Sequence, residues 1–207
     1  MEQTCASCGR SVRFQYNGSW AVGCGGCAAL ILRDGFPTGY KHMPLVEDLS
    51  PLKVGMVGAY KGKEFKVVGR TRAVTHDGYR NFWSLKGDLD LPWLVQSYGQ
   101  YALLKPYPGV ISKRELRNAK PGTSNRIDPG ATYQVEYADK DPVFATEGEL
   151  VAALPVPYAF EIEMGRDPLD KVLVLIKPDG DAVCLHGVMV EYAELNFREP
   201  LQLAQWT

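Results

Sequence analysis

The sequence predicts a mainly β protein in which a small cysteine-bearing N-terminal module precedes an antiparallel β-barrel or β-sandwich domain. Three observations support this class. Four of the five cysteines fall within residues 5–27. From residue 52 onward, short apolar or alternating runs recur with turn residues between them, which is typical of successive β-strands. No long stretch has apolar residues at the 3.6-residue period of an amphipathic helix.

Residues 1–32 contain a C-x2-C-x15-C-x2-C pattern made by Cys5, Cys8, Cys24 and Cys27. Zinc prefers four nitrogen or sulfur ligands in a tetrahedron, and this spacing falls in the range of structural zinc sites. The pattern therefore predicts a zinc ribbon with four thiolate ligands. Two alternatives stay open: the cysteines act as a redox dithiol or as disulfides, or they bind another metal.

The segment between the cysteine pairs predicts a β-hairpin. Apolar and polar residues alternate over 12–16 and over 20–22, with Asn17-Gly18 between the two runs. An Asn-Gly pair in this position is a strong signal for a type I′ turn, because that turn needs positive φ at both central residues. We therefore expect the cysteine pairs at the open ends of two paired strands. Residues 33–51 contain several glycines and prolines and are expected to form a linker.

Residues 52–207 are expected to form the β-rich domain. Strands are predicted at 52–60, 64–74, 81–87, 91–99, 100–106, 131–139, 157–165, 170–178 and 181–197, with a short strand or helical turn at 147–155. This many short strands at close spacing favours a barrel or a sandwich.

A basic connecting loop is predicted at residues 105–130, which are rich in Pro, Gly, Ser and Asn. Its candidate nucleic-acid contacts are Lys113, Arg114, Arg117 and Lys120. Basic density suits phosphate contact, but binding of single strands usually adds stacking aromatic residues, and the basic stretch 105–126 has only one. We expect a solvated basic loop, with a nucleic-acid-binding module as the alternative.

Composition and motifs restrict the function classes. The net charge of −1 provides no general attraction to nucleic acid or membranes. The N-terminus lacks the pattern of a signal peptide, and no apolar run approaches the roughly 18 residues of a membrane-spanning helix, so a cytoplasmic location is expected. The G-x-S-x-G nucleophile motif is absent. The carboxylate pairs Glu147/Glu149 and Glu161/Glu163 are expected on solvated strand faces.

One glycine-rich pattern opens the β-rich domain. It comprises Leu52, Val54, Gly55, Gly58, Tyr60, Gly62, Phe65, Val67, Gly69 and Arg70, and it continues with Phe82-Trp83-Ser84-Leu85, Trp93-Leu94 and Gly99-Gln100-Tyr101-Ala102-Leu103. The glycines suit bulges and bends of a small closed barrel, and Tyr60, Phe65, Trp83 and Trp93 are expected to fill its interior. Arg70 is expected in a surface or interstrand ion pair.

This pattern resembles the bacterial family called domain of unknown function 4178, over roughly residues 52–195 and most clearly over 52–105. The resemblance implies no established activity. It implies an accessory protein encoded near membrane-stress and polyamine-related genes, which favours a binding or scaffolding role.

The sequence as a whole favours a non-catalytic adaptor with a structural Zn²⁺ ion and a protein partner, in a bacterial membrane-stress system. The first alternative is the nucleic-acid-binding module described above. The second is an enzyme whose site is assembled from residues that the sequence does not group. The sequence indicates no oligomeric state.

Overall fold

The computed structural model describes residues 1–33, 45, 50–75, 78–109, 120–128, 131–140, 143–152, 161–166, 171–177 and 183–198. Its strands are β1 (Glu2–Thr4), β2 (Ser11–Arg13), β3 (Ala21–Gly23), β4 (Leu30–Leu32), β5 (Val57–Tyr60), β6 (Lys63–Thr75), β7 (Gly78–Gly87), β8 (Trp93–Ser97), β9 (Gln100–Pro106), β10 (Ser124–Asp128), β11 (Ala131–Lys140), β12 (Val143–Leu150), β13 (Glu161–Arg166), β14 (Lys171–Lys177) and β15 (Val183–Val190). A 3₁₀ helix, η1 (Tyr192–Leu195), follows β15. These ranges contain no α-helix, which confirms the predicted mainly β class.

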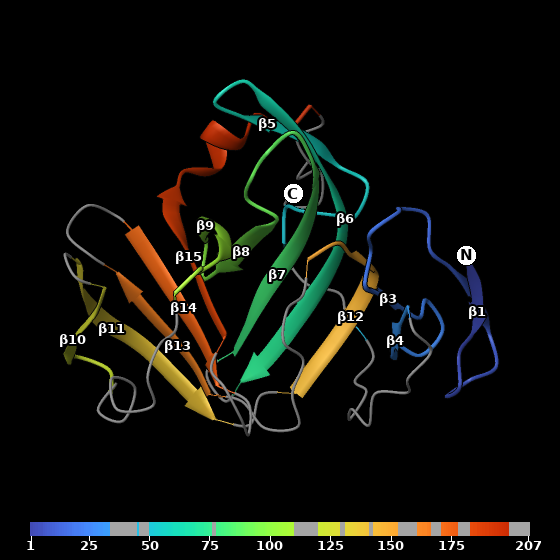
Figure 1. Cartoon of the computed structure of the whole chain (residues 1–207), viewed down its shortest axis with the longest axis horizontal. Helices are drawn as coiled ribbons and strands as arrows, with labels where there is room; N and C mark the ends of the chain where they lie inside the picture. The colour runs from blue at the N-terminus through green and yellow to red at the C-terminus, as the bar shows by residue number, and fades with distance from the viewer. Residues whose placement is uncertain are drawn as a thin grey trace, which may run out of the picture.

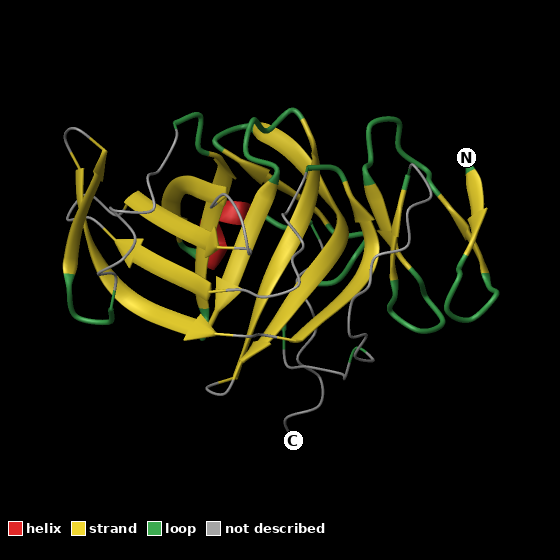
Figure 2. Ribbon diagram, turned by 60° about the horizontal axis from the view of Figure 1, so that its bottom comes forward, coloured by secondary structure: helices red, strands yellow, loops and turns green. Residues whose placement is uncertain are grey.

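All strand pairs are antiparallel, and most strands join one continuous sheet (Figure 1). The order is β10-β11-β13-β14-β15-β9-β8-β7-β6-β12-β3-β4, with β5 paired to β6, while β1 and β2 form a separate two-stranded sheet. Among the described strands, the order has two different ends, β10 and β4, so the sheet is not closed into a barrel. It curls strongly instead and is sandwich-like (Figure 2).

Two short strands differ from their predicted extent. Strand β10 lies inside the segment 105–130, which was predicted as a loop, and pairs with β11. Its sequence, Ser124–Asp128, has no apolar alternation, so only its partner reveals it as a strand. Strand β5 begins at Val57 although the run of strand-like residues starts at Leu52. The backbone turns before it, at Gly55, where φ is +105°.

The sheet buries both of its faces, because successive side chains of a strand point in opposite directions. On β7, Phe82 belongs to one apolar cluster and its neighbour Trp83 belongs to the other. The first cluster also contains Ala21 of β3 and Val174 of β14, although these strands lie far apart in the sheet order. The sheet therefore curls until distant strands share a core.

The second cluster is covered by β5, which among the described strands pairs only with β6, and by η1 and the segments beside them. It contains Tyr60, Phe65 and Trp83, with Leu195 of η1 packed among them. The expectation that the large aromatic residues are buried is confirmed, but Trp93 lies in the first cluster. The prediction that all four residues fill one barrel interior is therefore wrong, because the open sheet places them on its two opposite faces.

Polar side chains are also buried on the face that carries Trp83. The side-chain oxygen of Gln96 accepts hydrogen bonds from Ser50 Oγ at 2.7 Å, Asn81 Nδ2 at 3.2 Å and Trp83 Nε1 at 3.1 Å. A buried polar atom without such partners would cost on the order of 1–3 kcal/mol. Gln96 therefore fixes how three separate parts of the chain pack on this face.

Strand β12 joins the cysteine-bearing module to the main sheet. It pairs with β6 through residues 143–148 and with β3 through residues 148–150. Three glycines meet where it changes partner, since Gly148 lies opposite both Gly69 and Gly23. A Cβ atom on Gly23 would lie 2.4 Å from the Thr146 carbonyl oxygen, and one on Gly69 would lie 2.3 Å from that of Glu149. Such contacts are too short for any side chain, so glycine is required there.

A buried carboxylate at the same junction binds the turn between the two cysteine pairs. Glu149 is 4% exposed and accepts hydrogen bonds from Gln15 N at 2.5 Å, Tyr16 N at 3.1 Å and Ser19 Oγ at 2.6 Å. The expectation that Glu147 and Glu149 lie on a solvated face is therefore wrong for Glu149. Its side chain is turned inward because the turn presents three donors at one place.

The neighbouring Glu147 forms an ion pair with Arg70 across β12 and β6, with 2.6 Å between Oε1 and Nη2. The Arg70 side chain is 9% exposed and its guanidinium lies over the Trp83 ring at 4.7 Å. The expected interstrand ion pair of Arg70 is confirmed. Because the arginine side is buried, removing Glu147 alone would leave a charge with little solvent and cost more than breaking an exposed pair.

The first prediction concerns Glu149. We expect Glu149→Gln to lower the free energy of unfolding by about 1–3 kcal/mol, because an amide keeps one acceptor oxygen and turns its NH₂ group toward backbone donors. Urea unfolding followed by tryptophan fluorescence measures this change. The control is Glu136→Gln on β11, where the side chain is exposed and the expected change is within about 0.5 kcal/mol. Equal effects of the two substitutions would contradict the role given to Glu149.

Candidate metal centre

Each cysteine pair lies in the turn of its own β-hairpin. Cys5 and Cys8 lie between β1 and β2, and Cys24 and Cys27 lie between β3 and β4. The predicted hairpin across Asn17-Gly18 is therefore wrong, since the strands on its two sides belong to different sheets. The physical reason is that β3 already has partners on both edges, β4 and β12, and leaves no edge for β2.

The two turns have the same backbone design. In the first, Cys5 N donates to Arg10 O and Gly9 N donates to Cys5 O, and in the second, Cys24 N donates to Ala29 O and Ala28 N donates to Cys24 O, all at 2.8 Å. The residue after the second cysteine of each turn is left-handed, with φ of +72° at Gly9 and +57° at Ala28. The two turns thus have the same knuckle structure.

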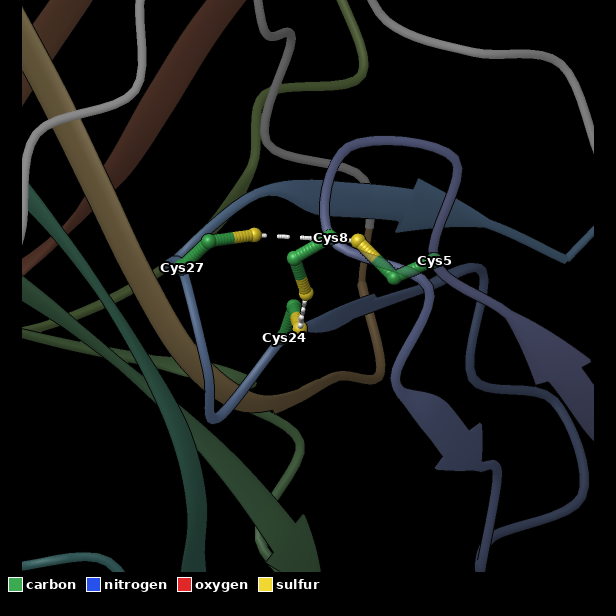
Figure 3. A group of neighbouring side chains, drawn as sticks. All are labelled: Cys5, Cys8, Cys24 and Cys27. Atoms are coloured by element: carbon green, nitrogen blue, oxygen red, sulfur yellow. Dashed lines mark hydrogen bonds between the residues drawn. The ribbon is translucent and has the colours of Figure 1, made fainter.

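The four sulfur atoms converge at one place (Figure 3), which confirms that the two pairs meet. All four Sγ atoms lie within 4.8 Å of one another. The distance is 3.7 Å between Cys5 and Cys27 and 3.6 Å between Cys8 and Cys24. A tetrahedron with metal–sulfur bonds of about 2.3 Å has sulfur atoms about 3.8 Å apart. The arrangement can therefore hold one metal ion with four protein ligands.

Packing covers the centre from one side only. Cys5 and Cys24 are each 1% exposed and lie in a small apolar cluster with Val12, Phe14, Val22 and Ala29. Cys27 is half-buried, and Cys8 is exposed. The four converging cysteines thus have very different access to solvent.

The thiols of the two turns differ in acidity. The backbone N–H of Arg10 favours the Cys8 thiolate, but hydrogen bonds with Cys24 and Cys27 outweigh it and raise the pKa of Cys8 to about 12. Burial disfavours the Cys24 thiolate, but the backbone N–H groups of Gly26 and Cys27 outweigh burial and lower the pKa of Cys24 to about 7. Protons and a metal ion compete for the same sulfur atoms, so metal binding releases protons.

Arg10 is a residue of this centre that the motif did not single out. Its Nη1 atom donates to Gly25 O at 3.3 Å, and a Cβ on Gly26 would meet its side chain. Arg10 therefore covers the second knuckle from the first. The sequence signal for Arg10 was its position directly after Cys8-Gly9. Sequence position alone does not indicate that its side chain turns toward the second knuckle.

Most of the other candidate residues lie outside the part of the chain that the structure describes. Lys113, Arg114 and Arg117 lie outside the described residues, and the described Lys120 is exposed. The side chains of Glu161 and Glu163 also lie outside the description. Cys184 on β15 is buried, which raises the pKa of its thiol to about 12 and keeps it protonated.

No family model matches the chain, and neither a curated protein nor a solved structure matches it. The resemblance of residues 52–105 to the domain of unknown function 4178 stays a prediction. Among the described residues, no helix has the length and apolar character needed to cross a membrane.

The second prediction follows from the repeated knuckle. We expect Ala28→Gly to raise the melting temperature of the metal-loaded protein, because a left-handed conformation costs a residue with a Cβ roughly 1–2 kcal/mol. Gly9→Ala should lower the melting temperature for the same reason. A steric clash would not contribute, because nothing lies within 4 Å of a Cβ added at Gly9.

The control for this pair is Gly25→Ala. A Cβ on Gly25 has open space, and the residue is not left-handed, so the change should be small. Thermal unfolding followed by circular dichroism compares the four proteins. A loss of stability in Ala28→Gly would show that the left-handed conformation is not what limits the second knuckle.

Proposed function

We propose that the protein is a non-catalytic adaptor in which a structural zinc ion organises an N-terminal zinc ribbon joined to a β-rich binding domain. The observation that supports this proposal most is the set of four Sγ atoms within 4.8 Å. Four thiolates favour zinc among the common metals of proteins. They also complete its tetrahedron, which leaves no coordination position for a substrate.

A structural role for zinc agrees with the size of the module. Strands β1 to β4 have three residues each, and their local cluster has six buried members. So small a core provides little hydrophobic stabilisation, and small folds commonly add a metal ion for this reason. Zinc would hold the β1–β2 hairpin against the β3–β4 hairpin, which no ladder hydrogen bonds of the described strands connect.

The adaptor role is supported by the way in which the two parts are connected. The ribbon strands β3 and β4 continue the main sheet through β12, and the turn between the cysteine pairs is bound by Glu149. A partner would thus meet the ribbon and the sheet as one hydrogen-bonded unit. The resemblance to an accessory family favours a protein partner, and we extend it to a membrane-stress system.

The third prediction tests the metal. We expect the purified chain to contain about one equivalent of zinc per protein, as four thiolate ligands bind a single ion. Replacement by Co²⁺ should give the strong absorption near 700 nm and the thiolate charge-transfer bands of a tetrahedral sulfur site. Cys24→Ser should lose both, and Cys184→Ser should keep both. Retention of less than half an equivalent of every metal by the wild type, with four freely reactive thiols, would refute the zinc centre.

The fourth prediction tests the partner class. We expect weak retention of the protein on heparin and on single-stranded DNA at low salt, and no change in the triple variant Lys113→Ala, Arg114→Ala, Arg117→Ala. Phosphate contacts would instead give tight binding that falls steeply with salt. Salt-sensitive retention that the triple variant loses would replace the adaptor with the nucleic-acid-binding module.

A further inference from the structure

The four proposed metal ligands differ sharply in exposure. Cys8 is exposed at the tip of the first knuckle, whereas Cys5 and Cys24 are each 1% exposed. The exposed Sγ of Cys8 lies 3.6 Å from Sγ of the buried Cys24. An oxidant in solution therefore reaches the Cys8 sulfur first. The Cys24 sulfur of the other knuckle is close enough to form a disulfide with it after a small movement.

We propose that this centre is an oxidant-responsive switch in which Cys8 is the sulfur that reacts with a peroxide and Cys24 is the sulfur that resolves it. The inference rests on the proposed metal centre. In the metal-bound centre Cys8 is deprotonated, because a metal ligand must be a thiolate. This thiolate attacks the peroxide, the O–O bond breaks, and Cys8 becomes a sulfenic acid while hydroxide leaves. The Cys24 thiolate then attacks the Cys8 sulfur and a second hydroxide leaves.

The balance of this sequence is simple. Two thiolates, one H₂O₂ and two protons from solvent give one disulfide and two waters, so two sulfurs are oxidised and the peroxide is reduced. Two of the four ligands are consumed. Cys5 and Cys27 remain, and two thiolates hold a zinc ion far more weakly than four, because tetrahedral structural sites use all four ligands. The metal is then released.

The state of the centre reaches the main sheet through the backbone. Cys24 follows β3 directly, and β3 pairs with β12 at Val22 opposite Glu149 and at Gly23 opposite Gly148. Glu149 in turn binds the turn that connects the two knuckles. A new Cys8–Cys24 bond in place of the metal therefore acts on the residues that connect the ribbon to β12.

The experiment uses the full-length zinc-loaded protein and hydrogen peroxide. Zinc release is followed with a chromogenic chelator, the first disulfide is identified by mass spectrometry, and amide hydrogen exchange is measured on β12 before and after oxidation. We expect release of one zinc per Cys8–Cys24 disulfide and faster exchange at residues 148–150. Cys184→Ser is the control and should behave as the wild type, because Cys184 is buried on β15.

Two further variants test which sulfur reacts first. Cys8→Ser should slow disulfide formation at least several-fold, whereas Cys5→Ser keeps both Cys8 and Cys24 and should still form the Cys8–Cys24 disulfide. A first disulfide that excludes Cys8, or zinc release that precedes any disulfide, would overturn the switch while leaving the metal centre intact. Absence of zinc before any oxidant is added would instead refute the proposed centre itself.

Discussion

Strand β12 is the element on which the arrangement of this protein depends, because it has two different partners along its length. Its first part pairs with β6 and its last residues pair with β3. The change of partner brings three backbones so close that Gly23, Gly69 and Gly148 leave no room for side chains. The buried carboxylate of Glu149, next to this junction, then binds the turn between the cysteine pairs. The position of the metal centre relative to the sheet follows from these contacts.

The rest of the sheet is organised by burial on both faces. An open antiparallel sheet normally exposes one face to water, but here the curl of the sheet covers one face and η1 with β5 covers the other. Central strands therefore carry large apolar residues at consecutive positions, as Phe82-Trp83 on β7 shows. Gln96 gives the second face a polar centre whose three partners come from two separate segments, residue 50 and strand β7.

The proposed metal centre and the main sheet stabilise different parts of the cysteine-bearing module. Each knuckle is a local structure, made by hydrogen bonds within six residues. The β3–β4 knuckle is attached to the sheet by β12, whereas β1 and β2 form a sheet of their own. The two knuckles are connected by a small apolar cluster, by the hydrogen bond from Arg10 to Gly25 O and by the four converging sulfurs, so a bound ion would complete the fold of the ribbon. This dependence is also why loss of the exposed ligand Cys8 would matter beyond the knuckle that contains it.

The sequence by itself determined the β class, most strand positions and the four cysteines that converge, because alternation, turn residues and the C-x2-C spacing are properties of neighbouring residues. It also indicated that Tyr60, Phe65, Trp83 and Trp93 are buried. Only the tertiary structure decided that β2 and β3 do not pair, that polar β10 is a strand, and that Glu149 is buried. The physical reason is the same in each case: a strand's partner and a carboxylate's donors come from residues far away in the chain, and local pattern carries no information about them.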